Sequence, residues 1–302
     1  LIYGGGGTEH EVSLRSKDYF ISQINPKSFN VFPVEITKEG EWLHEGQNCS
    51  LGYKNNLIIG SEKHPIDVAI PCVHGYPNET GHLPALFEIS QLPYLGCNQE
   101  TSVLCFNKLS TKLWLELSGI KTTPFMSVKD PSDLQEAEFF LDKHSDIFIK
   151  ATNQGSSVGC YRCKDKTQLE KSITEAFKLS PFVLIEKTIS GREFELSVFE
   201  YNNEIHLTNP CEILSPNENF YTYEEKYSSN SETKVELVAK VDADIVQEMK
   251  RQAKVAYDVL KIRHLSRMDF FLSPDGEVYL NEINTMPGHT SIPMFPSMMV
   301  YY

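Results

Sequence analysis

From Leu265 to Gly288 the chain reads LSRMDFFLSPDGEVYLNEINTMPG, and this stretch indicates both its fold and its chemistry. Two apolar segments flank the turn sequence Ser-Pro-Asp-Gly, which predicts a β-hairpin. Four strongly polar residues interrupt the two strands: Arg267, Asp269, Glu282 and Asn284. Side chains alternate between the faces of a strand, so a four-residue loop at 273–276 would pair Arg267 with Glu282 and place all four on one face. A three-residue loop would split them.

Charged groups clustered on a sheet are costly to bury unless their charges compensate. One interpretation is a structural ion pair with solvated neighbours. The other is a divalent metal site, because the oxygens of Asp269, Glu282 and Asn284 are hard ligands and no His or Cys shares their face. Such ligands favour Mg²⁺ or Mn²⁺ over zinc. Because Mg²⁺ usually lies between carboxylates and substrate phosphates, this second interpretation predicts a nucleotide.

Two glycine-rich loops are candidates for holding phosphate. The segment KATNQGSSVG begins at Lys150 and predicts a strand that leads into a Gly/Ser hairpin, whose N–H and hydroxyl groups would donate to phosphate oxygens. The loop Gly4–Ser13 fails the G-x-G-x-x-G pattern, which disfavours a nicotinamide-dependent oxidoreductase. Its carboxylates suit a substrate ammonium group instead, although simple helix capping by Glu11 is the alternative.

The composition limits the class of protein. The 302 residues include 28 Lys plus Arg and 41 Asp plus Glu, for a formal net charge of −13. Such an acidic chain is a poor candidate for binding nucleic acid or an anionic membrane surface. No apolar run is long enough to span a bilayer. The seven cysteines are scattered and odd in number, which favours reduced thiols in a cytoplasm.

The pattern of elements changes along the chain. The first third alternates between strands and helices, which predicts a small doubly wound α/β domain with parallel strands. Its strands are expected at 1–3, 31–36, 66–73 and 92–96, and its helices at 12–24 and 83–90. Further strands are expected at 122–128, 146–150 and 182–187, and further helices at 101–118, 132–144 and 244–260. The polar stretch 215–231 is expected to be a lid.

Several motifs together resemble one known family. They are GGGGTEHEVSL, His74-Gly75, FNKLSTK, KATNQGSSVG, VLIEKTISGREFEL, FYTYEEKY, SRMDFFL and NEINTMPGHTS, in the family's order along nearly the whole chain. The chain thereby resembles the ATP-grasp ligases and, among them, the D-alanine–D-alanine ligase family. The resemblance implies an α/β (α+β) ATP-grasp fold with ATP held between two antiparallel sheets. It also implies an N-terminal subdomain at 1–96, a central subdomain at 97–187 and a C-terminal subdomain at 188–302.

The resemblance also implies roles for individual residues. Phosphate contacts would come from Lys108, Lys150, Ser157 and Lys226. Adenine would be framed by Glu186, Lys187 and Ile189, and the ribose held by Glu193. Two Mg²⁺ or Mn²⁺ ions would be bound by Asp269, Glu282 and Asn284. An oxyanion would be stabilised by Arg267 and the N–H of Gly288. The ammonium of the first D-alanine would meet Glu11, in a hydrogen-bonded set with Ser156 and Tyr227. Further substrate contacts would come from His74 and Ser291.

The implied activity is ATP-dependent ligation of two D-alanines through an acylphosphate, for peptidoglycan synthesis in a bacterial cytoplasm, by a homodimer. The acceptor stays open, because Pro293 stands where the family often has a serine that holds the second substrate's carboxylate. D-serine, D-lactate or another amino acid are therefore alternatives. A non-catalytic ATP-binding module is a rival from another class, and the intact set of polar residues in the hairpin disfavours it.

Overall fold

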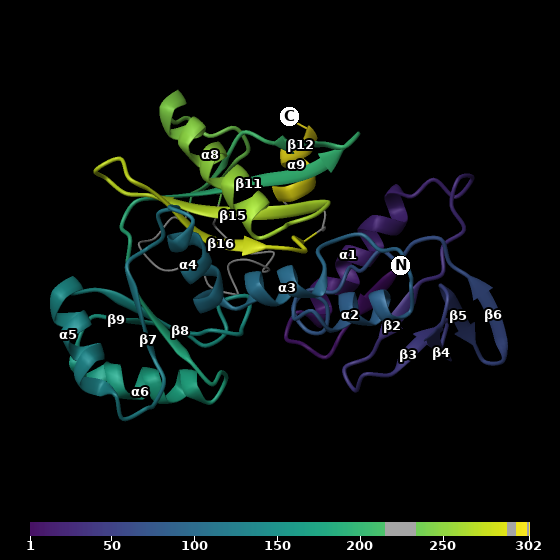
Figure 1. The fold of residues 1–302 in the computed structure, drawn as a ribbon, viewed down its shortest axis with the longest axis horizontal. Helices are drawn as coiled ribbons and strands as arrows, with labels where there is room; N and C mark the ends of the chain where they lie inside the picture. Colours follow the sequence, from purple (N-terminus) through teal and green to yellow (C-terminus); the bar gives the residue numbers. More distant parts are fainter. Residues whose placement is uncertain (215–233, 289–293, 301) are drawn as a thin grey trace.

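A computed structural model describes residues 1–214, 234–288, 294–300 and 302, which build three β-sheets (Figure 1). The first sheet has its strands in chain order: β1 (Ile2–Gly4), β2 (Val34–Ile36), β3 (Trp42–His44), β4 (Gln47–Gly52), β5 (Asn56–Ile59) and β6 (Glu62–Pro65). Strands β1 and β2 are parallel, and the pairs from β2 to β6 are antiparallel. The helices of this part are α1 (His10–Gln23) and α2 (His82–Ile89).

The parallel part of this sheet is smaller than predicted. The expected strands at 66–73 and 92–96 appear only as isolated parallel bridges, Ile2 with Pro71 and Ala69 with Tyr94. Proline has no N–H to donate, so Pro71 and Pro93 keep these ladders short. The antiparallel strands β3–β6 were not predicted, because they are short and largely half-exposed or exposed and lack a clear apolar alternation.

The second sheet is antiparallel throughout. Its order is β7 (Phe125–Val128), β10 (Val183–Lys187), β8 (Ile147–Ala151) and β9 (Cys160–Cys163). Helices α5 (Leu134–His144) and α6 (Lys166–Phe177) pack on one face, where Ile149 and Ile185 are buried in the core. Because side chains alternate, Lys150 and Glu186 lie on the opposite face.

The third sheet runs β14 (Lys234–Glu236), β13 (Cys211–Leu214), β11 (Arg192–Tyr201), β15 (Leu265–Leu272) and β16 (Val278–Asn284), with β12 (Glu204–Leu207) also paired to β11. Helix α8 (Ala243–Val259) covers the face that carries Phe194, Met268 and Phe270, and α9 (Met294–Val300) packs near β11. In Figure 1 the second and third sheets lie between α8 on one outer side and α5 and α6 on the other. This arrangement confirms the predicted ATP-grasp architecture.

One predicted helix is two. The expected helix at 101–118 is divided into α3 (Gln99–Phe106) and α4 (Lys108–Leu117) at Asn107, whose backbone is extended (φ −83°, ψ 104°). The Asn107 side chain caps α4 by accepting a hydrogen bond from the Ser110 N–H at 2.9 Å. The break makes Lys108 the first residue of α4, and its N–H donates to the Thr152 carbonyl at 3.0 Å.

Helices α3 and α4 contribute Cys105 and Leu115 to the core of the third sheet, so the boundary near residue 97 stays a prediction. Across the described parts of the chain, we find no helix with the length and apolar character that a membrane crossing requires.

Candidate active site

A β-bulge aims the polar residues of the hairpin. Strands β15 and β16 pair Leu272 with Val278 and Phe270 with Leu280, and beyond the bulge they pair Asp269 with Glu282. The predicted four-residue loop at 273–276 is wrong, because it would pair Leu272 with Glu277. The predicted pairing of Arg267 with Glu282 is wrong as well, because turn and bulge together place Arg267 opposite Asn284. At the bulge, β16 has one residue more than β15. Without that residue, strict alternation would place Glu282 on the same face as buried Leu280. The bulge re-aims it, so all four polar residues still share the face away from α8.

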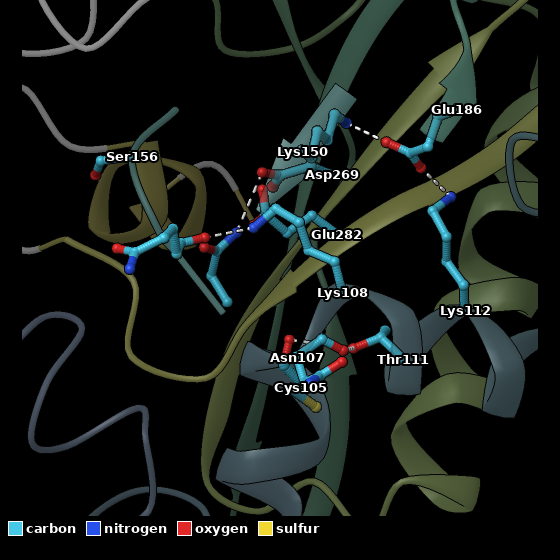
Figure 2. A network of polar contacts seen from close by, with 12 residues as sticks. Cys105, Asn107, Lys108, Thr111, Lys112, Lys150, Ser156, Glu186, Asp269 and Glu282 are labelled. Atoms are coloured by element: carbon cyan, nitrogen blue, oxygen red, sulfur yellow. Dashed lines mark hydrogen bonds and ion pairs between the residues drawn. The ribbon is translucent and has the colours of Figure 1, made fainter. Parts of the chain in front are cut away.

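Three of these residues contact one another, and the fourth, Glu282, contacts α4. Arg267 donates two hydrogen bonds of 2.8 Å to Asp269 and lies 3.1 Å from the buried carboxylate of Glu195 on β11. The side-chain amide of Asn284 donates to Asp269 at 3.1 Å. Glu282 pairs with Lys108 at 3.0 Å (Figure 2). Together these contacts bring three carboxylates and an amide beside an arginine and a lysine, whose charges largely compensate.

The donor set fits a hard cation that shares its ligands with a substrate. Within the described ranges no group of three or more His, Cys, Asp or Glu side chains forms a closed metal site. The hairpin offers instead two carboxylates and an amide on neighbouring strands, Asp269 and Glu282 being directly paired. Such a partial set suits Mg²⁺ or Mn²⁺, which complete their coordination with water and substrate phosphates.

A cavity of about 670 Å³ opens between the second and third sheets. The predicted site residues that line it are Lys108, Lys150, Ser157, Glu186, Lys187, Ile189, Glu193, Asp269 and Glu282. They come from both sheets, from α4 and from the glycine-rich loop, which are far apart in the sequence. Its volume suits a small-molecule ligand of nucleotide size.

Lys108 and the glycine-rich loop line this cavity together. The Lys108 ammonium donates to the Gln154 carbonyl at 2.6 Å, which ties α4 to the glycine-rich loop. In that loop Ser156 (φ 48°) and Ser157 (φ 62°) both take the left-handed conformation that is rare for residues other than glycine. Turn conformations are one way in which a backbone forms a concave, anion-binding loop.

A buried ion triad adjoins the same cavity, which Lys150 and Glu186 line. Glu186 pairs with Lys112 from α4 at 2.5 Å and with Lys150 from β8 (Figure 2). Burial alone would raise the pKa of Glu186, but the charges of Lys112 and Lys150 outweigh it and leave this pKa below its usual value. Burial would lower the pKa of Lys150, but Glu186 reverses the shift and raises it. Glu186 and Lys150 are therefore ionised at neutral pH.

The predicted contact between Glu11 and Ser156 is not found. Glu11 is exposed and pairs with Lys38 at 3.2 Å. The Ser156 hydroxyl donates instead to Glu9 at 2.5 Å. Glu9 is buried, and a Cβ on Gly75 or Gly155 would come within 2.9 or 3.0 Å of its carboxylate, so the two glycines give it room. Helical spacing could have identified Glu9, because it shares one face of α1 with the buried residues Val12, Ser13 and Ser16.

His74 uses both ring nitrogens on protein partners. Its Nδ1 donates to the Met286 carbonyl at 3.0 Å, so Nε2 is left to accept from the Ser16 hydroxyl at 2.8 Å. Burial lowers the pKa of His74 more than the nearby Glu9 raises it, which keeps the ring neutral. The nearby Glu79 accepts from the Gly75 N–H at 2.7 Å. The histidine thus anchors the strand end that leads to Gly288, and its substrate contact stays a prediction.

Some predicted positions cannot be placed. Lys226, Tyr227, Ser291 and Pro293 lie outside the described residues, as does the predicted lid at 215–231. Lys112 and Glu195 were not predicted to belong to the site. Glu9 was predicted only as one of the carboxylates of the Gly4–Ser13 loop, and the ammonium was assigned to Glu11.

Comparisons with known proteins agree with this geometry. Two family models match, described as "D-ala D-ala ligase N-terminus" over residues 1–97 and "D-ala D-ala ligase C-terminus" over residues 114–301. A D-alanine–D-alanine ligase of Aeromonas hydrophila is 46% identical over 100% of this chain and 93% of that protein. A D-alanine–D-alanine ligase of Shewanella halifaxensis is 44% identical over 99% of this chain and 92% of that protein.

Solved structures match in the same way. The structure of D-alanyl-alanine synthetase A from Vibrio cholerae has a TM-score of 0.94 and 38% identity, covering 100% of this chain and 92% of that chain. The structure of the VanG D-Ala:D-Ser ligase from Enterococcus faecalis has a TM-score of 0.88 and 29% identity, covering 99% of this chain and 93% of that chain. This chain therefore belongs to the D-alanine–D-alanine ligase family.

Proposed function

We propose that this protein joins two D-alanines into D-alanyl-D-alanine, converting ATP to ADP and phosphate, as a step in making peptidoglycan precursor. One observation carries the proposal above others: the cavity between the two antiparallel sheets brings Lys108, Lys150 and Ser157 together with Asp269 and Glu282. That is a phosphate-binding set facing a metal-binding set. Full-length similarity to proteins named D-alanine–D-alanine ligase supports the substrate.

The chemistry explains why both sets are needed. A carboxylate does not react with an amine, because its leaving group would be oxide. Transfer of the γ-phosphoryl group of ATP to the carboxylate gives an acylphosphate, whose leaving group is phosphate. Two anions must approach for this transfer, and Lys108 and Lys150 would reduce their repulsion. Asp269, Glu282 and Asn284 would hold two Mg²⁺ or Mn²⁺ ions, which supply further positive charge between carboxylate and triphosphate.

Further residues would handle the amino acids. We assign the ammonium of the first D-alanine to Glu9, whose buried carboxylate already accepts from Ser156, in preference to exposed Glu11. The amine of the second D-alanine would then attack the acylphosphate. Arg267 and the Gly288 N–H would stabilise the resulting oxyanion. The pairing of Arg267 with Asp269 and Glu195 supports this role, because it fixes the direction of the guanidinium.

The nucleotide would occupy the rest of the cavity. Glu186, Lys187 and Ile189 would frame adenine and Glu193 the ribose, since all four line its wall. The need for ATP supports a cytoplasmic location. Exposed apolar side chains on the neighbouring helices α2 and α3, among them Ile89 and Val103, support a homodimer. The three separate sheets support the division into three subdomains.

D-Serine is the second candidate for the acceptor. The similarity to a D-Ala:D-Ser ligase at 29% identity supports it, although identity to the D-alanine–D-alanine ligases is higher.

The test is release of ADP and phosphate from ATP with Mg²⁺ when D-alanine, L-alanine, D-serine and D-lactate are offered in turn, each alone and paired with D-alanine. We expect turnover with D-alanine alone, and D-alanyl-D-alanine as the product by mass spectrometry. Turnover only with a D-alanine plus D-serine pair would reassign the acceptor. No turnover in any mixture that contains D-alanine would refute the proposed function.

A further inference from the structure

The buried triad of Lys112, Glu186 and Lys150 contains two lysines with different freedom. Lys112 and Glu186 have only 2% and 3% of their side chains exposed, whereas Lys150 has 13% exposed. Lys150 and Glu186 line the cavity, and Lys112 does not. In Figure 2 the two lysines approach the Glu186 carboxylate from opposite sides. One lysine therefore faces the ligand space and the other lies behind it.

Lys112 is fixed by a complete set of partners. Its ammonium has three N–H groups, and three oxygens lie within hydrogen-bonding distance: Glu186 Oε1 at 2.5 Å, Thr122 Oγ1 at 2.6 Å and Thr123 Oγ1 at 2.7 Å. The Thr123 hydroxyl in turn donates to Glu186 at 2.8 Å. This arrangement satisfies every N–H donor of Lys112, so any movement of its ammonium would break hydrogen bonds.

Lys150 must serve two partners in turn. In this structure it pairs with Glu186, yet its place at the cavity wall is also where the proposed function requires a cation for the nucleotide phosphates. When Lys150 turns to a phosphate, Glu186 loses one of its two counter-ions. A buried carboxylate with no partner is strongly unfavourable, so the exchange needs a second cation that stays.

We infer that Lys112 is this permanent counter-ion: it neutralises Glu186 and thereby releases Lys150 to the phosphates of the bound nucleotide. Lys112 is a positioning residue, because it acts through Glu186 and Lys150 and does not touch the ligand. The inference rests on the proposed ATP site, but it does not depend on which amino acids are joined.

The test is a double-mutant cycle on nucleotide binding, measured by calorimetry with ADP and Mg²⁺ and, separately, with adenosine. K112M removes the permanent counter-ion, E186Q removes the charge that needs it, and K112M/E186Q removes both. K121M is the matched control, because Lys121 is a lysine paired with Glu277 at the surface and away from the cavity. Thermal denaturation of each variant reports whether it is folded.

We expect K112M to weaken ADP binding by about tenfold or more, and adenosine binding by less than about twofold. In the E186Q background the same substitution is expected to change ADP binding by less than about twofold, because a neutral amide does not retain Lys150. K121M is expected to bind ADP as the wild type does.

Three results would overturn the inference. These are ADP binding by folded K112M equal to wild type, an equal loss of adenosine and ADP binding, or a loss as large in the E186Q background as in the wild type. If K112M fails to fold, the double variant K112M/E186Q still tests the inference, because the inference requires that it bind ADP with the same affinity as E186Q. If the wild type binds ADP but does not ligate D-alanine, the proposed function fails while the cycle still tests Lys112. If the wild type binds no ADP, both fail.

Discussion

Replacing Glu282 with glutamine isolates one charge of the proposed metal site. Glutamine has nearly the same shape, so the change removes the negative charge and leaves the packing of the hairpin intact. Glu282 lies opposite Asp269 and pairs with Lys108 at 3.0 Å, with 29% of its side chain exposed. We expect E282Q to remain folded and to lose most of its turnover.

The expected magnitudes distinguish the effect of E282Q on folding stability from its effect on turnover. At an effective dielectric constant of about 20, the Coulomb energy of the Lys108–Glu282 pair is on the order of 5 kcal/mol, and desolvation offsets most of it. The free energy of unfolding should therefore fall by only about 1–2 kcal/mol. A divalent ion carries twice the charge of Lys108, so the loss in the transition state should be larger, at about 4 kcal/mol. That corresponds to about a 10³-fold lower kcat.

The assay is steady-state ADP release at saturating ATP and D-alanine over a series of Mg²⁺ concentrations. E277Q is the matched control, because Glu277 lies at the turn of the same hairpin, pairs with Lys121 and has 45% of its side chain exposed. E277Q should keep wild-type turnover. A near-normal rate for E282Q at saturating Mg²⁺ would refute the assignment of Glu282 as a metal ligand.

Three further outcomes are expected. E9Q should raise the KM for D-alanine about ten- to hundredfold, since a charged hydrogen bond is lost, and E11Q should change this KM less than about twofold. A larger effect of E11Q than of E9Q would refute the assignment of the ammonium to Glu9. Burial, and next the charge of Glu9, raise the pKa of Glu79 to about 8, so the folded state retains a proton that the unfolded chain releases from about pH 4.5. The free energy of unfolding should therefore fall as the pH rises from about 4.5 to 8, and urea titrations should show a smaller fall for E79Q than for the wild type. An equal fall in both proteins would contradict this. F270A should cost about 3–5 kcal/mol in chemical denaturation, and exposed F139A less than about 0.5 kcal/mol; similar losses would contradict the assigned core.

Much of the site could be predicted from the hairpin and the glycine-rich loop. Alternation along a strand predicted that Arg267, Asp269, Glu282 and Asn284 share a face, and they do. The register was wrong by two residues. One comes from the turn, which pairs Leu272 with Val278 where a four-residue loop would pair it with Glu277, and the other comes from a β-bulge, which leaves no mark in a pattern of apolar and polar residues. Its effect is visible only in three dimensions, where Leu280 and Ile283 enter the core and Glu282 does not.

Other features depended on contacts that the sequence does not reveal. Lys112 is one of several polar residues on a helix, and such lysines are usually solvated. Its burial goes with three partners that the sequence does not reveal: Glu186, Thr122 and Thr123. The break at Asn107 was hidden by apolar residues that continue at helical spacing on both sides of it. Glu9 and Glu11 are chemically identical. Helical spacing separates their faces, but it does not reveal that Ser156 of the glycine-rich loop lies against Glu9.

The central claim is that the carboxylate of the first D-alanine takes a phosphoryl group from ATP in the cavity between the two sheets. The most direct measurement uses D-alanine labelled with ¹⁸O in its carboxylate, with mass spectrometry of the phosphate released during turnover. Attack of the second amine on an acylphosphate breaks the bond between the carbonyl carbon and the labelled oxygen. The phosphate should therefore carry one ¹⁸O atom for each dipeptide formed. Dipeptide formation with unlabelled phosphate would contradict the account.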